Sequence, residues 1–284
     1  MGGRVFQLFV INPGSTSTKI ALFQSEQIVF DHTEQHDVQT LKSFHSITDQ
    51  FDFRLEAVYH FVKQHSINLA EIDAFVGRGG LLKPIPSGTF IIDDYMLNDL
   101  SQNIGGEHAS NLGAILANTL GKTFKKPAYI VDPVVVDELD DLARLSGHPY
   151  FQRKSIFHAL NQKSVARFAA DELGKSYEDL NLIVAHLGGG ISVGAHRQGR
   201  VVDVNNALDG EGPYSPERSG TLPVGELIKL CFSGEKSQAE IQRMIKGQGG
   251  IVAYLGTNDI RSIIERIKQK NDVFAKQIYR GMAY

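Results

Sequence analysis

Residues 5–23 read VFQLFVINPGSTSTKIALF, an apolar run, a turn of small and polar residues, and a second apolar run. The same order recurs in residues 182–195, LIVAHLGGGISVGA, where three consecutive glycines form the turn. A polar turn and a third apolar run follow each stretch, so both predict a three-stranded meander. Glycine removes the Cβ that would block an anion, and hydroxyl and backbone N–H groups supply donors. Two such turns indicate a duplicated fold that binds a polyphosphate from both sides.

Length and composition narrow the class of protein. A chain of 284 residues has room for about two domains, each with its own core. The net charge of −3 argues against nucleic-acid binding, and no apolar stretch approaches the ~20 residues of a membrane span. The single cysteine, Cys231, excludes an intrachain disulfide and suits a reducing cytosol. We therefore expect a cytoplasmic protein that binds neither nucleic acid nor membrane.

The first half of the chain continues its meander with strands at 72–76 and 128–131, which alternate with helices. One helix carries apolar residues at helical spacing, namely Leu55, Val58, Tyr59 and Val62. Another helix is expected from Glu107 to Leu120, with Gly121 ending it. The alternation of strands and helices predicts an α/β layer architecture for residues 1–150.

The second half, residues 151–284, contains helices besides its meander. One helix is predicted over 158–173, with Val165, Phe168 and Ala169 facing inward. A later helix has an apolar face that includes Cys231, which predicts a buried thiol. The last helix reaches the end of the chain, whereas the first half follows its helices with further strands. We therefore expect a second domain that is truncated.

Two common nucleotide-binding fingerprints do not fit the glycine-rich turns. Residues 14–19 lack the second glycine of a P-loop, and residues 188–194 carry Val193 where G-x-G-x-x-G needs its last glycine. The placement of the turns in hairpins instead resembles the actin–sugar kinase–heat-shock ATPase superfold. That superfold consists of two ribonuclease-H-like domains.

Five short motifs resemble the acetate and butyrate kinase family, in the order in which the family carries them. They are VINPGSTSTK at 10–19, GRGG at 77–80, IFH at 156–158, AHLGGG at 185–190 and ERSG at 217–220. The resemblance implies an actin-like ATPase domain in each half, residues 1–150 and 151–284. It also implies an enzyme that uses ATP and Mg²⁺ to phosphorylate the carboxylate of a short-chain fatty acid, giving an acyl phosphate. A homodimer is implied in the same way.

The types of residue in these motifs suit the chemistry of such a transfer. A carboxylic acid with a pKa of ~4–5 is already ionised at pH 7, so the acceptor needs no general base. The difficulty lies in bringing one anion against another, which calls for arginines, a histidine, an amide and a metal ion. A nucleophilic triad would have no role in this reaction.

The resemblance implies roles for individual positions. Arg78 would hold the acceptor carboxylate and the incoming phosphoryl group, and His158 and Arg218 would stabilise the oxygens of the transferring group. Asn12 would bind phosphate or its metal, and Asp132 would hold Mg²⁺. The other positions are those of the two phosphate loops and the acceptor site: Ser15, Ser17, Lys19, His186, Gly188, Gly189, Gly190 and His108.

Each of these residues also has an ordinary structural interpretation. Arg78 fits a surface salt bridge, and Arg218 fits a local pair with Glu217. His158 fits the packing of a helix start, and His186 fits a core histidine because apolar strand residues flank it. Asp132 precedes a proline and so fits a simple turn.

Two departures from the acetate kinase pattern bear on the acceptor. Residues 159–162, ALNQ, stand where acetate kinases have a Gly-Thr-Ser-His run, and residues 79–88 resemble the butyrate and branched-chain acid kinase version of that loop. The resemblance therefore favours an acceptor longer than acetate. A non-catalytic nucleotide- or phosphate-binding module is the alternative, and a sugar kinase with Asp132 as its base ranks last.

Overall fold

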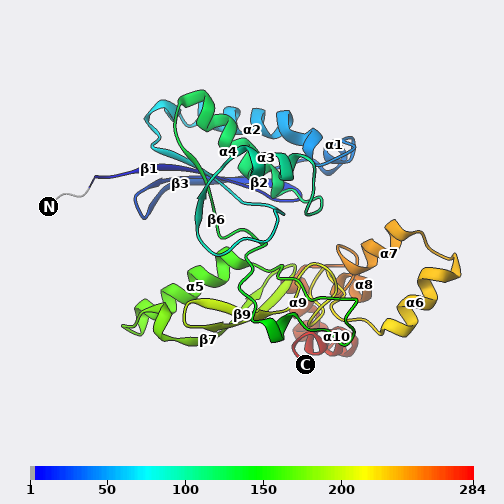
Figure 1. The fold of residues 1–284 in the computed structure, drawn as a ribbon. Coiled ribbons are helices and arrows are strands. Elements are labelled where there is room, and N and C mark those ends of the chain that lie inside the picture. Colours follow the sequence, from blue (N-terminus) through cyan, green and yellow to red (C-terminus); the bar gives the residue numbers. More distant parts are fainter. Residues whose placement is uncertain (1–3) are drawn as a thin grey trace. The chain divides into compact units, whose positions relative to one another are not determined.

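The computed structural model describes residues 4–284, and the chain divides between Val136 and Asp137 into two compact units (Figure 1). Each unit contains one β-sheet with helices packed against it. The sequence places the change of domain near residue 150, and the identity of each half as an actin-like ATPase domain stays a prediction.

The first unit is built on a six-stranded sheet with the order β3–β2–β1–β4–β6–β5. The strands are β1 (Gln7–Pro13), β2 (Ser17–Gln24), β3 (Gln27–Gln35), β4 (Ala74–Gly77), β5 (Thr89–Ile91) and β6 (Ala128–Val131). The first three strands form an antiparallel meander, whereas β4 runs parallel to β1 and β6 runs parallel to β4. Meander and parallel strands therefore lie where the sequence predicts them. The short β5, antiparallel to β6, was not anticipated.

Helices cover one face of this sheet (Figure 1). They are α1 (Val38–Lys42), α2 (Phe51–Gln64), α3 (Asp94–Ser101) and α4 (Asn111–Phe124), with short 3-10 turns η1 (Thr48–Gln50) and η2 (Leu69–Glu71). The α4 helix contacts β1, β4 and β6 through a buried stripe of Leu112, Leu116 and Leu120. This i, i+4, i+8 spacing places the three buried side chains on one face of the helix.

Two details of these helices differ from the sequence predictions. The α2 face that faces the core is Arg54, Val58 and Phe61, while Tyr59, expected inside, is 39% exposed. The α4 helix passes through Gly121 and ends at Lys125, which has the left-handed conformation of a helix cap. Gly121 is needed inside the helix, since a Cβ there would lie 2.8 Å from the Lys126 carbonyl oxygen.

The second unit holds a three-stranded antiparallel sheet of β7 (Asn181–Leu187), β8 (Ile191–Arg197) and β9 (Arg200–Val204). The predicted meander is confirmed. Its ladder shifts in register between Ala195 and His196 of the second strand, and the first meander shifts between Leu22 and Phe23 of its own second strand. This shared irregularity is consistent with a duplication, which stays a prediction.

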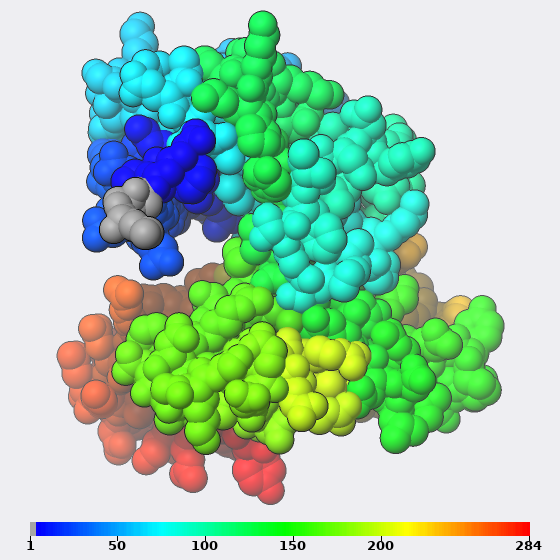
Figure 2. Space-filling model, turned by 60° about the vertical axis from the view of Figure 1, so that its left-hand side comes forward, coloured from blue at the N-terminus to red at the C-terminus, as the bar shows by residue number. Residues whose placement is uncertain are grey.

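The helices of the second unit precede and follow the sheet. They are α5 (Ala159–Glu172), α6 (Val224–Ser233), α7 (Gln238–Ile245), α8 (Ile251–Leu255), α9 (Ile260–Lys270) and α10 (Val273–Ala283), with 3-10 turns η3 (Asp141–Arg144) and η4 (Tyr177–Asp179). The last helices, orange to red in the space-filling view, are exposed at the surface of this unit (Figure 2). They share a small core of Ile251, Ile263, Ala275 and Ile278.

Two predictions about burial in the second unit are wrong. On α5, Val165 is 46% exposed and Phe168 is 66% exposed, whereas Gln162 and Lys163 are buried. Cys231 is exposed, because α6 extends away from the sheet and buries none of its residues (Figure 1). Helical periodicity located both helices but selected the wrong face for α5.

Among residues 4–284, no helix combines the length and the apolar character that are needed to cross a membrane.

Candidate active site

The turn between β1 and β2 carries the first set of candidate phosphate ligands. The Gly14 N–H donates to the Ser17 carbonyl oxygen at 2.8 Å, and the His36 N–H donates to the Thr16 carbonyl oxygen at 2.9 Å. Ser15 is exposed at the turn, and Ser17 begins β2. The turn therefore has a defined backbone, with its hydroxyl-bearing residues at the end of the hairpin.

A buried arginine of α2 supports this turn. Arg54 is fully buried, and its Nη1 donates to the Ser17 carbonyl oxygen at 2.9 Å and to Thr18 Oγ1 at 3.1 Å. Its Nε and Nη2 donate to Gln50 Oε1 at 3.0 and 2.9 Å, and Nη2 lies 3.5 Å from the Ser15 carbonyl oxygen. Within residues 4–284 these partners are all neutral oxygens, and no carboxylate pairs with Arg54. Burial lowers the pKa of Arg54 to about 10, so the guanidinium stays charged at pH 7.

The buried side chains of Thr18 and His36 complete the support of the turn. The side chains of Thr18 and His36 are hydrogen-bonded at 2.8 Å, and both residues are buried. Burial lowers the pKa of His36, and the positive charge of Arg54 lowers it further. A neutral His36 thus lies beside a charged Arg54, and together they order the backbone of residues 15–18.

Arg78 lies beside Asn12 in the first unit. Asn12 lies near the end of β1 and Arg78 directly follows the parallel strand β4, since Ile11 of β1 pairs with Gly77 of β4. The Arg78 N–H donates to the Ile11 carbonyl oxygen at 3.1 Å, and Arg78 Nη1 donates to Asn12 Oδ1 at 3.2 Å. The structure therefore brings these two candidates together, at the carboxyl ends of the strands where α/β sheets bind ligands.

Close packing positions the backbone of Arg78. A Cβ at Gly113 of α4 would lie 2.5 Å from the Arg78 carbonyl oxygen, and one at Gly77 would lie 2.1 Å from the Gly113 carbonyl oxygen. Next along the chain, Asn111 is fully buried and its Oδ1 accepts from the Leu81 N–H at 2.9 Å. Helix α4 thus holds the Gly-Arg-Gly-Gly loop by direct backbone contact.

Two further candidates of the first unit, Asp132 and His108, are held by hydrogen bonds. Asp132 is buried with a φ of 38°, and its Oδ1 accepts from the Ser87 hydroxyl at 2.6 Å and the Gly88 N–H at 2.8 Å. His108 Nδ1 is hydrogen-bonded to Ser110 Oγ at 2.7 Å, at the start of α4.

Lys19 lies opposite Asn12 in the β1–β2 ladder and pairs with Asp31 at 3.1 Å. Both side chains of this pair are about half exposed. Such a surface pair is worth only about 0–1 kcal/mol, so the ammonium group is readily available to a phosphate.

In the second unit, the turn of Gly188, Gly189 and Gly190 is shaped by its neighbours. None of the three has a positive φ, so they are not required by the backbone conformation. A Cβ at Gly188 would lie 2.7 Å from His186 Nε2, and one at Gly190 would lie 2.3 Å from Arg218 Nη1. These glycines are there because side chains lie directly against the turn.

Arg218 lies against this turn and is partly buried. Its N–H donates to Ser215 Oγ at 3.1 Å, while Ser215 Oγ donates to the Gly189 carbonyl oxygen at 2.6 Å. Its Nη1 donates to the Ala207 carbonyl oxygen. Burial lowers the pKa of Arg218, although Glu217 and Asp209 oppose the shift. The structure brings Arg218 and the glycines together as one cluster.

His158 and His186 lie face to face beside the same turn. Their ring centroids are 3.7 Å apart and their planes differ by 11°. His186 Nδ1 is hydrogen-bonded to Asn161 Oδ1 at 2.7 Å, and His158 Nδ1 to Ser192 Oγ at 2.9 Å. His186 is partly exposed, hydrogen-bonded to Asn161 and stacked on His158, so it is not a core histidine. Two positive charges at this separation would repel, which disfavours simultaneous protonation of both rings.

A metal site built from protein ligands alone is not found. No group of three or more His, Cys, Asp or Glu side chains is arranged to hold a metal ion within residues 4–284. Magnesium in phosphoryl-transfer enzymes is bound by one or two carboxylates together with substrate phosphates and water. A single carboxylate such as Asp132 is therefore compatible with the ion, and its role as a ligand stays a prediction.

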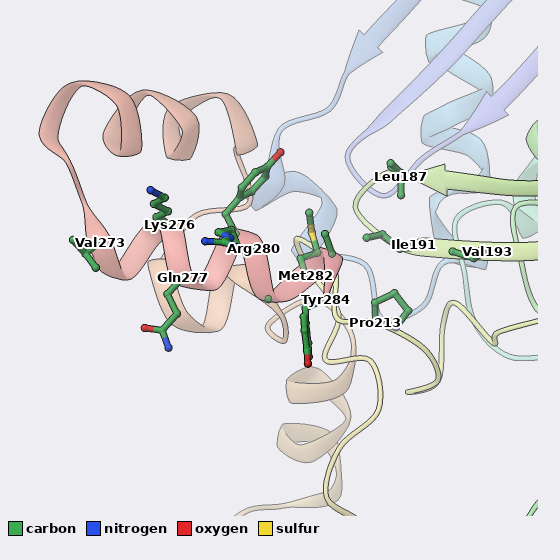
Figure 3. A pocket seen from close by; sticks show the side chains of 13 residues that line it. Leu187, Ile191, Val193, Pro213, Val273, Lys276, Gln277, Arg280, Met282 and Tyr284 are labelled. Atoms are coloured by element: carbon green, nitrogen blue, oxygen red, sulfur yellow. The ribbon is translucent and has the colours of Figure 1, made fainter.

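An apolar groove of about 1350 Å³ adjoins the second turn (Figure 3). Leu187 and Ile191, which flank the three glycines, line it together with Val193, Pro213 and the side chains of α10. The cationic side chains of Lys276 and Arg280 also line this mostly apolar groove.

Three residues of these clusters were missed by the sequence analysis: Arg54, Gln162 and Ser192. Gln162 and Ser192 are fully buried beneath His158 and are hydrogen-bonded to each other. Arg54 falls i−4 from Val58, so helical periodicity with a polar residue allowed on the inner face would have located it. Ser192 had a weaker signal, as the first polar residue after the triple-glycine turn.

Comparisons with known proteins agree on one family. The model of the Acetokinase family matches residues 146–282. The chain is 50% identical over 279 residues to a probable butyrate kinase of Clostridium botulinum (strain Eklund 17B / Type B), covering 98% of this chain and 78% of the relative. It is 53% identical, with the same coverage, to butyrate kinase 2 of Clostridium acetobutylicum.

Solved structures give the same result for the fold. Acetate kinase of Porphyromonas gingivalis matches with a TM-score of 0.76 at 20% identity, over 98% of this chain and 76% of that one. A propionate kinase of Francisella tularensis matches with a TM-score of 0.72 at 22% identity, over 98% of this chain and 77% of that one. The predicted α/β class of the actin-like ATPase superfold is confirmed.

Proposed function

This chain belongs to the acetokinase family, and on that premise we propose that it transfers the γ-phosphoryl group of ATP to the carboxylate of a short-chain fatty acid. The product is an acyl phosphate. The observation that carries the proposal is that each unit places an arginine beside its own hairpin. Arg78 contacts Asn12 in the first unit, and Arg218 lies against Gly190 in the second.

The residues present suit the charge problem of this reaction. The acceptor carboxylate attacks the γ-phosphorus, the bond from phosphorus to the bridging oxygen breaks, and ADP leaves with the electron pair. No proton has to be removed from the acceptor at pH 7. Arg78 would bind the carboxylate and the incoming phosphoryl group, and His158 and Arg218 would donate to its oxygens.

The nucleotide would be held by the two turns, with Ser15, Ser17 and Lys19 on one and His186 with Gly188–Gly190 on the other. Asn12 would bind phosphate or its metal, and His108 would lie near the acceptor. Mg²⁺ would be held by Asp132 together with the phosphates, and it would supply neutralisation of charge on the γ-phosphoryl group.

For the acceptor we propose butyrate or a branched acid of similar length. The proposal is supported by the loop at 79–88 and by the names of the relatives reported above. One methylene in an apolar pocket changes selectivity by only about 1–3 kcal/mol, so a range of acids is expected to react. A cytoplasmic homodimer is proposed on the family resemblance, and sedimentation velocity would test the dimer.

The decisive experiment is an acyl phosphate assay, with trapping by hydroxylamine, on butyrate, isobutyrate and acetate. We expect turnover with butyrate or isobutyrate, and a loss of at least about 10²-fold in kcat/KM for Arg78→Ala. The matched control is Arg243→Ala, since Arg243 is exposed on α7. Equal activities of the two variants would contradict the role given to Arg78.

The same protein distinguishes catalysis from binding alone. Calorimetric titration with ATP and Mg²⁺ measures nucleotide affinity without turnover. Binding with no acyl phosphate from any acid would favour the alternative of a non-catalytic nucleotide-binding module. Absence of both would overturn the proposed function.

A further inference from the structure

A continuous chain of buried hydrogen bonds runs beneath His158. Its members are Tyr177, His196, Gln162 and Ser192, which come from η4, β8, α5 and β8. Tyr177 is 4% exposed, His196 is 2% exposed, and the other two are fully buried. A buried chain of this kind has a direction, because each hydroxyl or ring nitrogen must either donate or accept.

The direction is set at Gln162. Its Nε2 lies 2.9 Å from the Ser192 carbonyl oxygen and 2.8 Å from Ser192 Oγ. A backbone carbonyl only accepts, so the amide NH₂ must face Ser192, and the amide oxygen must face the other way. The two protons of Nε2 are then both used, one for each oxygen of Ser192.

The amide oxygen of Gln162 in turn determines the tautomer of His196. Gln162 Oε1 is 3.0 Å from His196 Nε2 and can only accept, so His196 carries its proton on Nε2. His196 Nδ1 then accepts from the Tyr177 hydroxyl at 2.6 Å. Burial lowers the pKa of His196 to about 4, and the charge of Lys163 adds to this effect. A ring with one proton at pH 7 agrees with the donors and acceptors around it.

At the other end of the chain, the hydrogen bonds of Ser192 determine whether His158 Nδ1 donates or accepts. Ser192 Oγ accepts from Gln162 Nε2 and from the His158 N–H, which lies at 3.4 Å. A hydroxyl has two lone pairs and one proton, so both lone pairs are in use. The remaining contact, from Ser192 Oγ to His158 Nδ1 at 2.9 Å, is therefore made by the hydroxyl proton.

We propose that Ser192 and Gln162 are positioning residues that hold His158 in the neutral tautomer with its proton on Nε2. In this tautomer Nδ1 accepts from Ser192, and Nε2–H would donate to an oxygen of the transferring phosphoryl group. The stack on His186 sets the plane of the ring, and the chain sets its protonation. The inference rests on the proposed function for its catalytic meaning, although the tautomer itself does not depend on it.

The chain also explains a glycine inside β8. A Cβ at Gly194 would lie 2.4 Å from Gln162 Oε1 and 3.2 Å from His196 Nε2. Only glycine leaves room for the amide to lie between Ser192 and His196. Gly194 is thus required by the same buried chain of hydrogen bonds.

Two substitutions break the chain in different ways. Ser192→Ala removes the donor to His158 Nδ1 and leaves the two tautomers to compete. Gln162→Glu keeps the shape but replaces the NH₂ with an acceptor, so the Ser192 hydroxyl turns toward the carboxylate. Ser192 then accepts from His158, which moves the proton to Nδ1.

The test is nitrogen-15 NMR of the histidine rings in the full chain, with His158 assigned by the signal that disappears in His158→Asn. We expect the wild-type ring to carry its proton on Nε2, Ser192→Ala to give a mixture, and Gln162→Glu to give Nδ1–H. For turnover we expect Ser192→Ala to lower kcat by about 10- to 100-fold, with KM values changed less than about twofold. Ser233→Ala, on exposed α6, is the matched control and should change neither readout.

The wild-type spectrum decides the inference even where a variant fails to fold. Nδ1–H in the wild-type protein would overturn it, whether or not the protein makes acyl phosphate. Nε2–H in a protein that phosphorylates no acid would leave the inference standing and overturn the proposed function instead. Unchanged kcat in a folded Ser192→Ala would also overturn the positioning role.

Discussion

The turn between β1 and β2 is supported from beneath by the buried guanidinium of Arg54, whereas the turn between β7 and β8 is confined by atoms that leave no room for a side chain. In the first turn, a Cβ at Gly14 would lie 3.3 Å from Ser17 Oγ, a tight but adjustable contact. In the second, a Cβ at Gly190 would lie 2.3 Å from Arg218 Nη1. One hairpin architecture is thus supported by hydrogen bonds from a fully buried arginine in one unit, and in the other by close contact with side chains that include the Arg218 guanidinium.

The two supports also differ in the charge that they bury. Arg54 stays protonated with a pKa of about 10, and its hydrogen-bond partners are neutral. His196 stays neutral with a pKa of about 4. If the proposed function holds, the buried charge of Arg54 would attract phosphate to the first turn. The neutral chain beneath His158 would orient a donor in the second unit, where Arg218 supplies the charge.

The largest effect is expected from adding a methyl group to the glycine turn of the second unit, with the same change in the first turn as the comparison. Gly190→Ala would displace the Arg218 guanidinium, the flexible end of a side chain, so the protein should still fold. Loss of one such donor typically lowers kcat by about 10²–10³-fold, and we expect that range in the acyl phosphate assay. Gly14→Ala is the paired variant and should change the free energy of unfolding by less than about 0.5 kcal/mol. Equal losses of kcat and of stability in Gly190→Ala and Gly14→Ala would contradict this difference between the two turns.

A smaller effect is expected from removing the charge under the first turn. Arg54→Met fills similar space but removes both guanidinium donors from Gln50 Oε1, whereas Thr18 Oγ1 keeps its hydrogen bond to His36 and the Ser17 carbonyl oxygen keeps the Gly14 N–H. An unsatisfied buried group destabilises by about 1–3 kcal/mol, so a loss of up to about 3 kcal/mol in unfolding free energy is expected. Urea unfolding followed by circular dichroism measures it, because the chain has no tryptophan. Hydrogen exchange should show the loss in β1 and β2 and not in β8.

The control for that variant is Arg243→Ala, an exposed arginine whose removal should change stability by less than about 0.5 kcal/mol. A comparable loss in both variants, or exchange that rises equally in β8, would contradict a local role for Arg54.

The smallest effect is expected from acid. The folded pKa of His196, about 4, is below the ordinary value of about 6.5, so the unfolded chain binds the proton first as the pH falls. The contribution of His196 to stability is therefore complete above pH 6.5 and is lost toward pH 4. Between pH 7 and pH 5 the loss is about 2 kcal/mol.

Exchange of the β8 amides between pH 7 and pH 5, corrected for the intrinsic rate, measures this acid effect. His196→Gln keeps a donor toward Gln162 and does not titrate, so its dependence on pH should be flatter. A wild-type protein whose β8 protection does not change over this range would contradict a buried neutral His196.

How far the sequence predicts this structure depends on the element. Both meanders and the strands β4 and β6 follow from local pattern and are found. The same patterns fail for α5, where Phe168 is 66% exposed and Lys163 is 1% exposed. Lys163 is buried because Glu138 lies 2.8 Å from its Nζ, and the Gly199 carbonyl oxygen accepts from it at 3.0 Å. Such partners are distant in sequence, so no local pattern records them.

The candidate site divides in the same way. The motifs locate Asn12, Arg78, His158 and Arg218, and the structure joins Arg78 to Asn12 in one unit and Arg218 to its glycine turn in the other. The sequence analysis did not identify the buried residues that support them. Arg54 and Gln162 are polar residues on the inner faces of helices, a position that hydrophobic periodicity assigns to apolar side chains.

The sequence by itself determined the hairpins, the alternation of strands and helices, and which residues end at the turns, because these follow from the chemistry of neighbouring residues. Only the tertiary structure decided which polar groups are buried and in which direction their hydrogen bonds run. The physical reason is that a buried polar group is tolerated only when partners from other elements satisfy it, as Ser192 and His196 do for Gln162. Those partners meet only after the chain has folded.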